Sequence, residues 1–333
     1  MSTINWLFEI NFAIFAIFLI LFVTELMGGV LLLIAYDATK SKVLPYIVPI
    51  WEVTGTFAAF WVVTADFAYP VMLWPVATML AAPILVFLIL IVLRNSSISF
   101  AELIMRRGWL NERRLYKLYG VATLGIGLVV LIILSAIVSG AGVTLSLTSP
   151  KFSLWGWVTN AGSLPYIVGV LFIAIGLAPV FYNIEALRRI TVPFTTLGVV
   201  IEAAALYLYS SSLLTGYFLI PGVLTIAAAL LYNVKATAPI ASQKFVFAFL
   251  GAIIVFAQSY LVYPTAFKLN GGLSVDAVTT SGPMVGAFYL LTLIGAFVVG
   301  LLMVLYMLTV WRAARLPMPP SPGVPTGPAV HNP

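Results

Sequence analysis

The chain has 333 residues, of which 62% are hydrophobic and 8% are charged, and its mean hydropathy is +1.14. Soluble proteins are about 25% charged and 45–50% apolar, so the composition excludes a soluble protein with a single anchor and predicts a polytopic membrane protein. The formal charge of +6 does not indicate a nucleic-acid partner, because the basic residues stand in short segments between apolar stretches.

Nine apolar stretches are candidates to cross a bilayer, which takes about 20 residues of helix. They cover about residues 6–36, 46–66, 70–93, 117–140, 164–183, 192–210, 213–233, 244–264 and 282–311. Residues 95–117 are highly charged and are expected to form a loop with a short amphipathic helix around Phe100–Arg107. The end of the chain, 316–333, is rich in proline and is expected to be a disordered tail.

These stretches predict an all-α membrane protein in which residues 1–315 form a single polytopic domain. We expect a first four-helix unit over 1–140, a second over 164–264, and a ninth helix over 282–311. Nine spans place the two termini on opposite sides of the membrane. With the carboxyl end in the cytoplasm, every Lys and Arg except Lys151 and Lys268 falls on the inner side, so the amino terminus is expected outside.

Three carboxylates lie within or at the rim of the first spans, namely Glu25, Glu52 and Asp66. An ionisable side chain at membrane depth costs on the order of 2.5–3.5 kcal/mol on insertion scales, so it usually faces a protein interior or a water-filled path. We therefore take the three as candidates for a proton path. The alternatives are a carboxyl bonded across helices for Glu25, a helix-start acid for Glu52 and a solvated rim residue for Asp66.

Two further polar residues, Glu202 and Gln258, stand inside the sixth and eighth spans. Alanines follow Glu202 directly and favour a close helix interface there, whereas Gln258 is typical of a hydrogen bond between membrane helices. Arg94 ends the third span and is interpreted mainly as a topological charge.

Haem and metal ligands are scarce in this sequence. It has no cysteine, and its single histidine, His331, lies in the tail. Because membrane-bound haem normally takes His or Met ligands, we expect no haem to be held by side chains of this chain. No metal-spaced His/Cys cluster, nucleotide-binding glycine loop or paired nucleophile and base occurs, so we expect no metal site and no catalytic residue of its own.

Several short motifs resemble subunit II of cytochrome bd-type quinol oxidases, in the same order over most of the chain. They are Val-Thr-Glu at 23–25 with Met27-Gly28, Trp51-Glu52, Ala-Tyr-Pro at 68–70, Leu93-Arg94, Tyr263-Pro264, Leu-Ser-Val-Asp-Ala-Val-Thr-Thr-Ser at 273–281, Leu305-Tyr306 and Trp311. The chain departs from the family pattern where Glu replaces Asp at 25 and 52, where Asn95 replaces Pro, and where Val53-Thr54-Gly55 replaces Gly-Asn-Gln.

The resemblance implies a subunit of a plasma-membrane enzyme that oxidises quinol and reduces oxygen to water with protons from the cytoplasm. It implies that haem b, with haem d as an option, is held by the partner subunit I, and that this chain supports that subunit and can carry a structural quinone. Lipids and small accessory membrane subunits are the other expected partners. Two alternatives stay open: a scaffold subunit of another cytochrome b complex, and a secondary transporter, which paired broken helices would favour.

Overall fold

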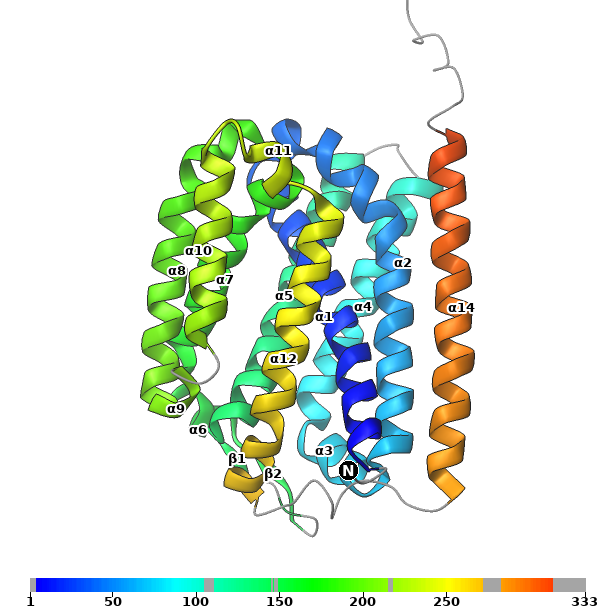
Figure 1. Cartoon of the computed structure of the whole chain (residues 1–333), viewed down its shortest axis with the longest axis vertical. Helices are drawn as coiled ribbons and strands as arrows, with labels where there is room; N and C mark the ends of the chain where they lie inside the picture. Colours follow the sequence, from blue (N-terminus) through cyan, green and yellow to red (C-terminus); the bar gives the residue numbers. More distant parts are fainter. Residues whose placement is uncertain are drawn as a thin grey trace, which may run out of the picture. The chain divides into compact units, whose positions relative to one another are not determined.

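The computed structural model of the chain describes residues 4–104, 111–144, 146, 149–214, 218–271 and 283–313. The tail with His331 lies outside the described residues, as do most of the polar loop before the last helix and the last three residues, 105–107, of the amphipathic helix expected near Phe100–Arg107. Within the described residues the fold is all-α apart from one two-stranded ribbon (Figure 1). The chain divides into two compact units, Met1–Phe288 and Tyr289–Pro333.

The helices of the first unit follow each other with short connections. They are α1 (Ile4–Ile34), α2 (Tyr36–Ala68), α3 (Pro70–Met79), α4 (Ala81–Ser99), α5 (Glu112–Ser139), α6 (Leu154–Val158), α7 (Ser163–Tyr182), α8 (Arg188–Tyr209), α9 (Ser211–Leu213), α10 (Leu219–Asn233), α11 (Ala238–Ala241) and α12 (Lys244–Gly271). A π-helical turn at Phe100–Ile104 extends α4, and a 3₁₀ turn at Glu185–Leu187 precedes α8. The strands β1 (Val143–Thr144) and β2 (Lys151–Phe152) pair antiparallel. The last helix, α14 (Pro283–Ala313), begins in the first unit and continues into the second.

Six described helices are long and apolar enough to cross a membrane. They are Glu9–Ile34, Tyr36–Ala68, Ala81–Glu102, Glu112–Ser139, Ser163–Tyr182 and Glu185–Tyr209. Four shorter apolar helical stretches accompany them, at Pro70–Met79, Leu219–Asn233, Lys244–Tyr260 and Pro283–Val298. The all-α membrane fold is therefore confirmed, whereas the count of nine spans and the side on which each terminus lies remain predictions.

The third expected span is a broken helix rather than a continuous one. α3 ends at Met79, Leu80 has non-helical backbone angles, and α4 begins at Ala81. Pro83 explains the position of the break, because a proline ring clashes with the carbonyl four residues before it, here that of Met79. Hydropathy alone does not detect the break, since both halves are apolar.

The second helix begins ten residues earlier than hydropathy predicts. α2 starts at Tyr36, with Ala35 as the single residue between it and α1, and continues through Pro45 and Pro49. Its first turns carry Asp37 and Lys40, which lower the local hydropathy without preventing helix formation. The start of the apolar stretch at residue 46 therefore does not coincide with the start of the helix at Tyr36.

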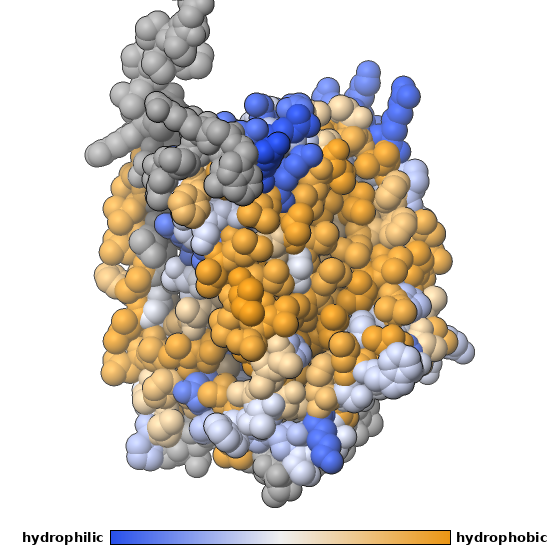
Figure 2. All heavy atoms as spheres, turned by 180° about the vertical axis from the view of Figure 1, so that it is seen from behind, coloured by the Kyte–Doolittle hydropathy of each residue, from blue (hydrophilic) through white to orange (hydrophobic). Residues whose placement is uncertain are grey.

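α1 is the central helix of the first unit. It packs against α2, α5, α7 and α12, and its apolar window is the most buried of the six candidate spans (Figure 1). The largest core cluster joins α1 to α2, α4, α5 and α7, and its fully buried aromatic members include Tyr116, Tyr119 and Tyr182. On the face in Figure 2, apolar side chains form a broad band and hydrophilic ones gather toward its two ends, as expected for a protein in a bilayer.

Candidate functional site

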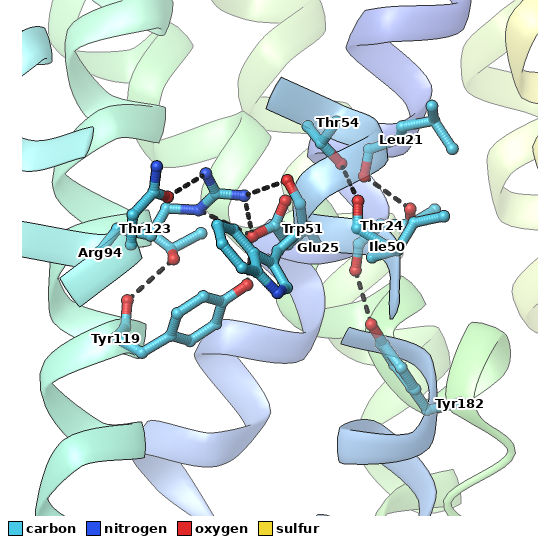
Figure 3. Close-up of polar contacts among 11 residues, drawn as sticks. Leu21, Thr24, Glu25, Ile50, Trp51, Thr54, Arg94, Tyr119, Thr123 and Tyr182 are labelled. Atoms are coloured by element: carbon cyan, nitrogen blue, oxygen red, sulfur yellow. Dashed lines mark hydrogen bonds and ion pairs between the residues drawn. The ribbon is translucent and has the colours of Figure 1, made fainter. Parts of the chain in front are cut away.

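A buried ion pair joins α1 to α4 in the core of the first unit (Figure 3). Arg94 donates from Nε to Glu25 Oε1 at 2.8 Å and also from Nη2 to the same oxygen. Tyr119 of α5 donates its hydroxyl to that oxygen as well. Glu25 and Tyr119 are fully buried and Arg94 is 4% exposed. Three helices thus contribute to one site, which we call the Glu25 cluster (Glu25, Arg94 and Tyr119).

Two other acceptors complete the environment of Arg94. Its Nη1 donates to Asn95 Oδ1 at 3.1 Å, and its Nη2 points to the Trp51 carbonyl of α2 at 3.5 Å. The guanidinium carbon also lies 5.9 Å from the centre of the Tyr119 ring. The guanidinium charge is therefore held by a carboxylate, polar oxygens and an aromatic face, which together compensate for its removal from water.

Adjacent glycines of α1 let two tyrosines approach the site. A Cβ atom on Gly28 would lie 2.5 Å from the Tyr182 hydroxyl, so only glycine leaves room for this ring to pack against α1. Gly29 faces Gly120 of α5, where a Cβ would lie 2.8 Å from the Gly29 carbonyl oxygen. This close approach of α1 and α5 brings Tyr119, the neighbour of Gly120, within reach of Glu25.

A second set of hydrogen bonds lies beside the Glu25 cluster. Tyr182 of α7 donates to the Thr24 carbonyl at 2.8 Å, and the Thr24 hydroxyl lies 2.9 Å from the Tyr46 hydroxyl of α2. Lys244, the first residue of α12, places its ammonium group 5.3 Å from the centre of the Tyr46 ring and 5.8 Å from that of Tyr182. A polar series therefore runs from the start of α12 to the residue adjacent to Glu25.

One oxygen of the Glu25 carboxylate is still available for chemistry. Oε1 accepts all three bonds of the Glu25 cluster, whereas Oε2 is buried and has no hydrogen-bond partner among the described residues. Arg94 stabilises the ionised carboxylate. The arrangement can hold a negative charge and present one lone-pair-bearing oxygen to a donor or a proton.

The structure does not bring the three predicted acids together. Glu52 and Asp66 are both exposed on α2, in contrast to Glu25. Among the described residues no hydrogen bond or ion pair joins Glu25 to either of them. The nearest link is through the backbone, because the carbonyl of Trp51, directly before Glu52, receives Nη2 of Arg94.

The other two polar candidates occupy different helices. Glu202 is partly exposed on α8, and its backbone packs against Gly169 of α7. Gln258 is partly buried on α12, which packs against α1. The described residues include no group of three or more His, Cys, Asp or Glu side chains that could hold a metal ion.

Sequence reasoning missed two members of the Glu25 cluster. Arg94 is not an interfacial topological charge but the buried partner of Glu25, and Tyr119 was not singled out. A signal for Arg94 was present, because a buried carboxylate requires a compensating cation. Tyr119 directly precedes a glycine in an apolar helix, which is a weaker signal.

Comparison with known proteins supports a likeness of fold. No protein-family model matches the sequence, and no curated protein matches it. Among solved structures, a chain of the bd oxidase from Geobacillus thermodenitrificans superposes with a TM-score of 0.65 at 15% identity, covering 95% of this chain and all of that one. The protein therefore has the fold of a bd oxidase chain over nearly its whole length.

Proposed function

We propose that the chain is the non-haem subunit, subunit II, of a bd-type quinol oxidase in the plasma membrane. The observation that carries this proposal is the fold likeness, which extends over 95% of this chain and leaves no part of the bd oxidase chain unmatched. The ordered motifs around Glu25, Trp51-Glu52 and Arg94 support it independently, since two of these three positions form the buried ion pair. Haem b, and haem d if present, would belong to the partner subunit, and the reaction would be oxidation of quinol with reduction of oxygen to water.

The proposal includes the full membrane topology. It assigns nine spans, with the broken α3–α4 pair counted as one and α10, α12 and α14 counted among them. The amino terminus would lie outside and the carboxyl tail in the cytoplasm, in agreement with the distribution of Lys and Arg. Residues 1–140 and 164–264 would each form a four-helix unit, and 282–311 the ninth helix.

We assign the Glu25 cluster a role in moving protons. A proton would reach Glu25 from the end of the unit that carries Lys244, along the hydroxyl groups of Tyr46 and Thr24. Support comes from the short spacing of that series, with 2.9 Å between these two hydroxyls, and from the free Oε2 of Glu25. Glu25 would accept the proton at Oε2 while Arg94 stays charged.

Glu52 and Asp66 would meet the haem subunit rather than lipid. Both are exposed on a helix of a membrane unit, and an unpaired carboxylate in contact with lipid is costly. A partner surface that supplies cationic or hydroxyl donors at their depth removes that cost. A structural quinone and small accessory subunits belong to the same assembly in this proposal.

A scaffold role without proton transfer is the second candidate, and the ion pair itself favours it. Arg94 and Tyr119 donate hydrogen bonds to Glu25, as expected for a carboxylate with a purely structural role. In that case the Glu25 cluster fixes α1, α4 and α5, and turnover does not depend on proton exchange at Glu25.

The test is affinity purification through this chain from its native membrane, followed by a reduced-minus-oxidised optical spectrum and a pyridine haemochrome assay. Co-purifying b-type haem with quinol oxidase activity supports the proposal, and a colourless protein without a partner overturns it. Glu25→Gln then separates the two candidates. Loss of turnover with the haem content retained supports the proton role, whereas unchanged turnover supports the scaffold role.

A further inference from the structure

A second set of polar residues, Thr195, Glu202 and Tyr209, lies along the contact between α7 and α8, separate from the Glu25 cluster. Three glycines spaced by seven residues face α8: the N-cap residue of α7, Gly162, and two residues within α7, Gly169 and Gly176. A Cβ on Gly176 would meet Thr195, one on Gly169 would meet Glu202, and one on Gly162 would meet Tyr209. These three residues of α8 are also spaced by seven, so the two antiparallel helices are in a constant register.

The contacts along this line are between backbones. A Cβ on Gly169 would lie 2.7 Å from the Glu202 backbone nitrogen, and one on Gly198 of α8 would lie 2.6 Å from the Ile173 nitrogen of α7. Close approach of this kind is how membrane helices associate through small residues. It holds the backbone of Glu202 against α7 along this contact line, which we call the α7–α8 seam.

Among the described residues, the two helices that pack most extensively against α8 supply no cation to Glu202. The helices packed against α8 are chiefly α7 and α10, and neither contains Lys, Arg, His, Asp or Glu. The titratable groups on them are Tyr166 and Tyr182 of α7 and Tyr232 of α10. Along α8 itself the nearest cation is Arg189, 13 residues away, or about 20 Å at 1.5 Å per residue.

The polar atoms near this seam are incompletely satisfied. Among the described residues no hydrogen bond or ion pair involves the Glu202 carboxyl, and the buried hydroxyls of Thr191 and Thr195 have no partner. The far end of the line is better connected, since Tyr209 donates to Ser163 at 3.2 Å.

The Glu202 side chain is partly exposed, so lipid can reach it at this seam. Val199 and Leu206, one turn away on the same face of α8, are buried. A carboxylate with neither cation nor water around it is much more costly than the neutral acid. Its situation is opposite to that of Glu25, which is buried in protein and bound to a guanidinium.

We propose that Glu202 is a neutral, proton-holding carboxylic acid at the lipid-accessible seam of α7 and α8, and that it is a modification site for lipid-soluble carbodiimides. The reaction is an addition: the acid proton passes to one carbodiimide nitrogen, and a carboxyl oxygen bonds to the central carbon. The O-acylisourea then rearranges to a stable N-acylurea, and no atom is lost. Glu25 differs from Glu202 because its carboxyl group is bound to the Arg94 guanidinium.

The test uses the full chain in its native membrane, treated with dicyclohexylcarbodiimide and analysed by peptide mass spectrometry. We expect the adduct mass on the peptide that contains Glu202, in higher yield than on the peptide that contains Glu25. A water-soluble carbodiimide with an added amine provides the contrast, because it should mark Glu185, whose side chain is 80% exposed, and spare Glu202. An adduct yield at Glu202 that is no higher than at Glu25 overturns the proposal.

An infrared measurement tests the protonated state of Glu202 separately, without a reagent that has to reach the side chain. The purified protein should show a C=O stretching band of a protonated carboxyl, shifted in D₂O, that is absent in Glu202→Gln and present in Glu25→Gln. A spectrum in which Glu202→Gln removes carboxylate absorption instead, or removes no band, overturns it. Neither readout depends on oxidase activity, so the result is independent of the proposed function.

Discussion

Arg94 and Glu25 are 69 residues apart in sequence and form an ion pair that is almost completely buried. Burial of such a pair contributes little net stability, because the desolvation of two charges offsets most of their attraction. Removal of one partner is different, since the other charge is left without compensation in the membrane interior. The first unit is therefore expected to be sensitive to the loss of either partner.

The first prediction is that Arg94→Met lowers the free energy of unfolding by about 3–5 kcal/mol, while the double variant Glu25→Gln/Arg94→Met loses less than that. The single change leaves the Glu25 carboxylate without its cation, and the double change removes both charges. The measurement is chemical denaturation of the purified chain in detergent. If the double variant is no more stable than Arg94→Met, the two side chains do not interact as the structure indicates.

The sequence predicted the helical scaffold well, because the apolar stretches are long and the basic residues between them are few. The burial of Glu25 was also foreseen from its position in the middle of an apolar span. Its ion pair with Arg94 was not predicted, since that contact depends on how α1 and α4 are rotated and on their relative depth. Those two quantities are set by how both helices pack on α5, at positions such as Gly29 against Gly120 and Leu90 against Gly125, not by local hydropathy.

The same limit explains why Glu52 was grouped with Glu25. Glu25 lies within an apolar span and Glu52 at the start of one, and the sequence does not show which face of its helix either residue occupies. The neighbouring helices decide which face of a helix is buried. On α2 the buried residues close to Glu52 are Thr54 and Phe57, and Glu52 lies on the opposite side of the helix. A one-dimensional pattern with low amphipathicity does not carry that information.

The second prediction concerns the hydroxyl of Tyr182. Tyr182→Phe should lower the free energy of unfolding by roughly 0.5–1.5 kcal/mol, because a buried hydrogen bond of 2.8 Å to the Thr24 carbonyl is lost while the ring remains. Tyr207→Phe is the matched control, since Tyr207 is 62% exposed on α8. Chemical denaturation of both variants measures the difference, and equal stability of the two would contradict the contact.

The third prediction tests the α7–α8 seam. Gly198→Ala should destabilise the protein by about 1–3 kcal/mol, because its Cβ would lie 2.6 Å from the Ile173 nitrogen and 2.8 Å from the Gly169 oxygen, and backbone atoms cannot move aside as side chains can. Gly55→Ala in α2 is the control, since no described atom lies within 4 Å of the added methyl group. Alanine also favours a helix over glycine, so this control should be neutral or slightly stabilising. Thermal unfolding in detergent compares the two, and a Gly198→Ala protein as stable as the control would mean that the helices are further apart.

The fourth prediction separates folding from assembly at Glu52. Because Glu52 is exposed on α2, Glu52→Gln should leave the unfolding of the purified chain unchanged within about 0.5 kcal/mol. The same change should lower the amount of haem that co-purifies with the chain, since we assign Glu52 to the surface that meets the haem subunit. The measurement is the ratio of haem to chain after affinity purification. Glu185→Gln is the control, because the Glu185 side chain is 80% exposed and lies in the 3₁₀ turn before α8. A normal ratio in Glu52→Gln would place the haem subunit on another face, and a destabilised chain would mean that Glu52 has a partner within its own fold.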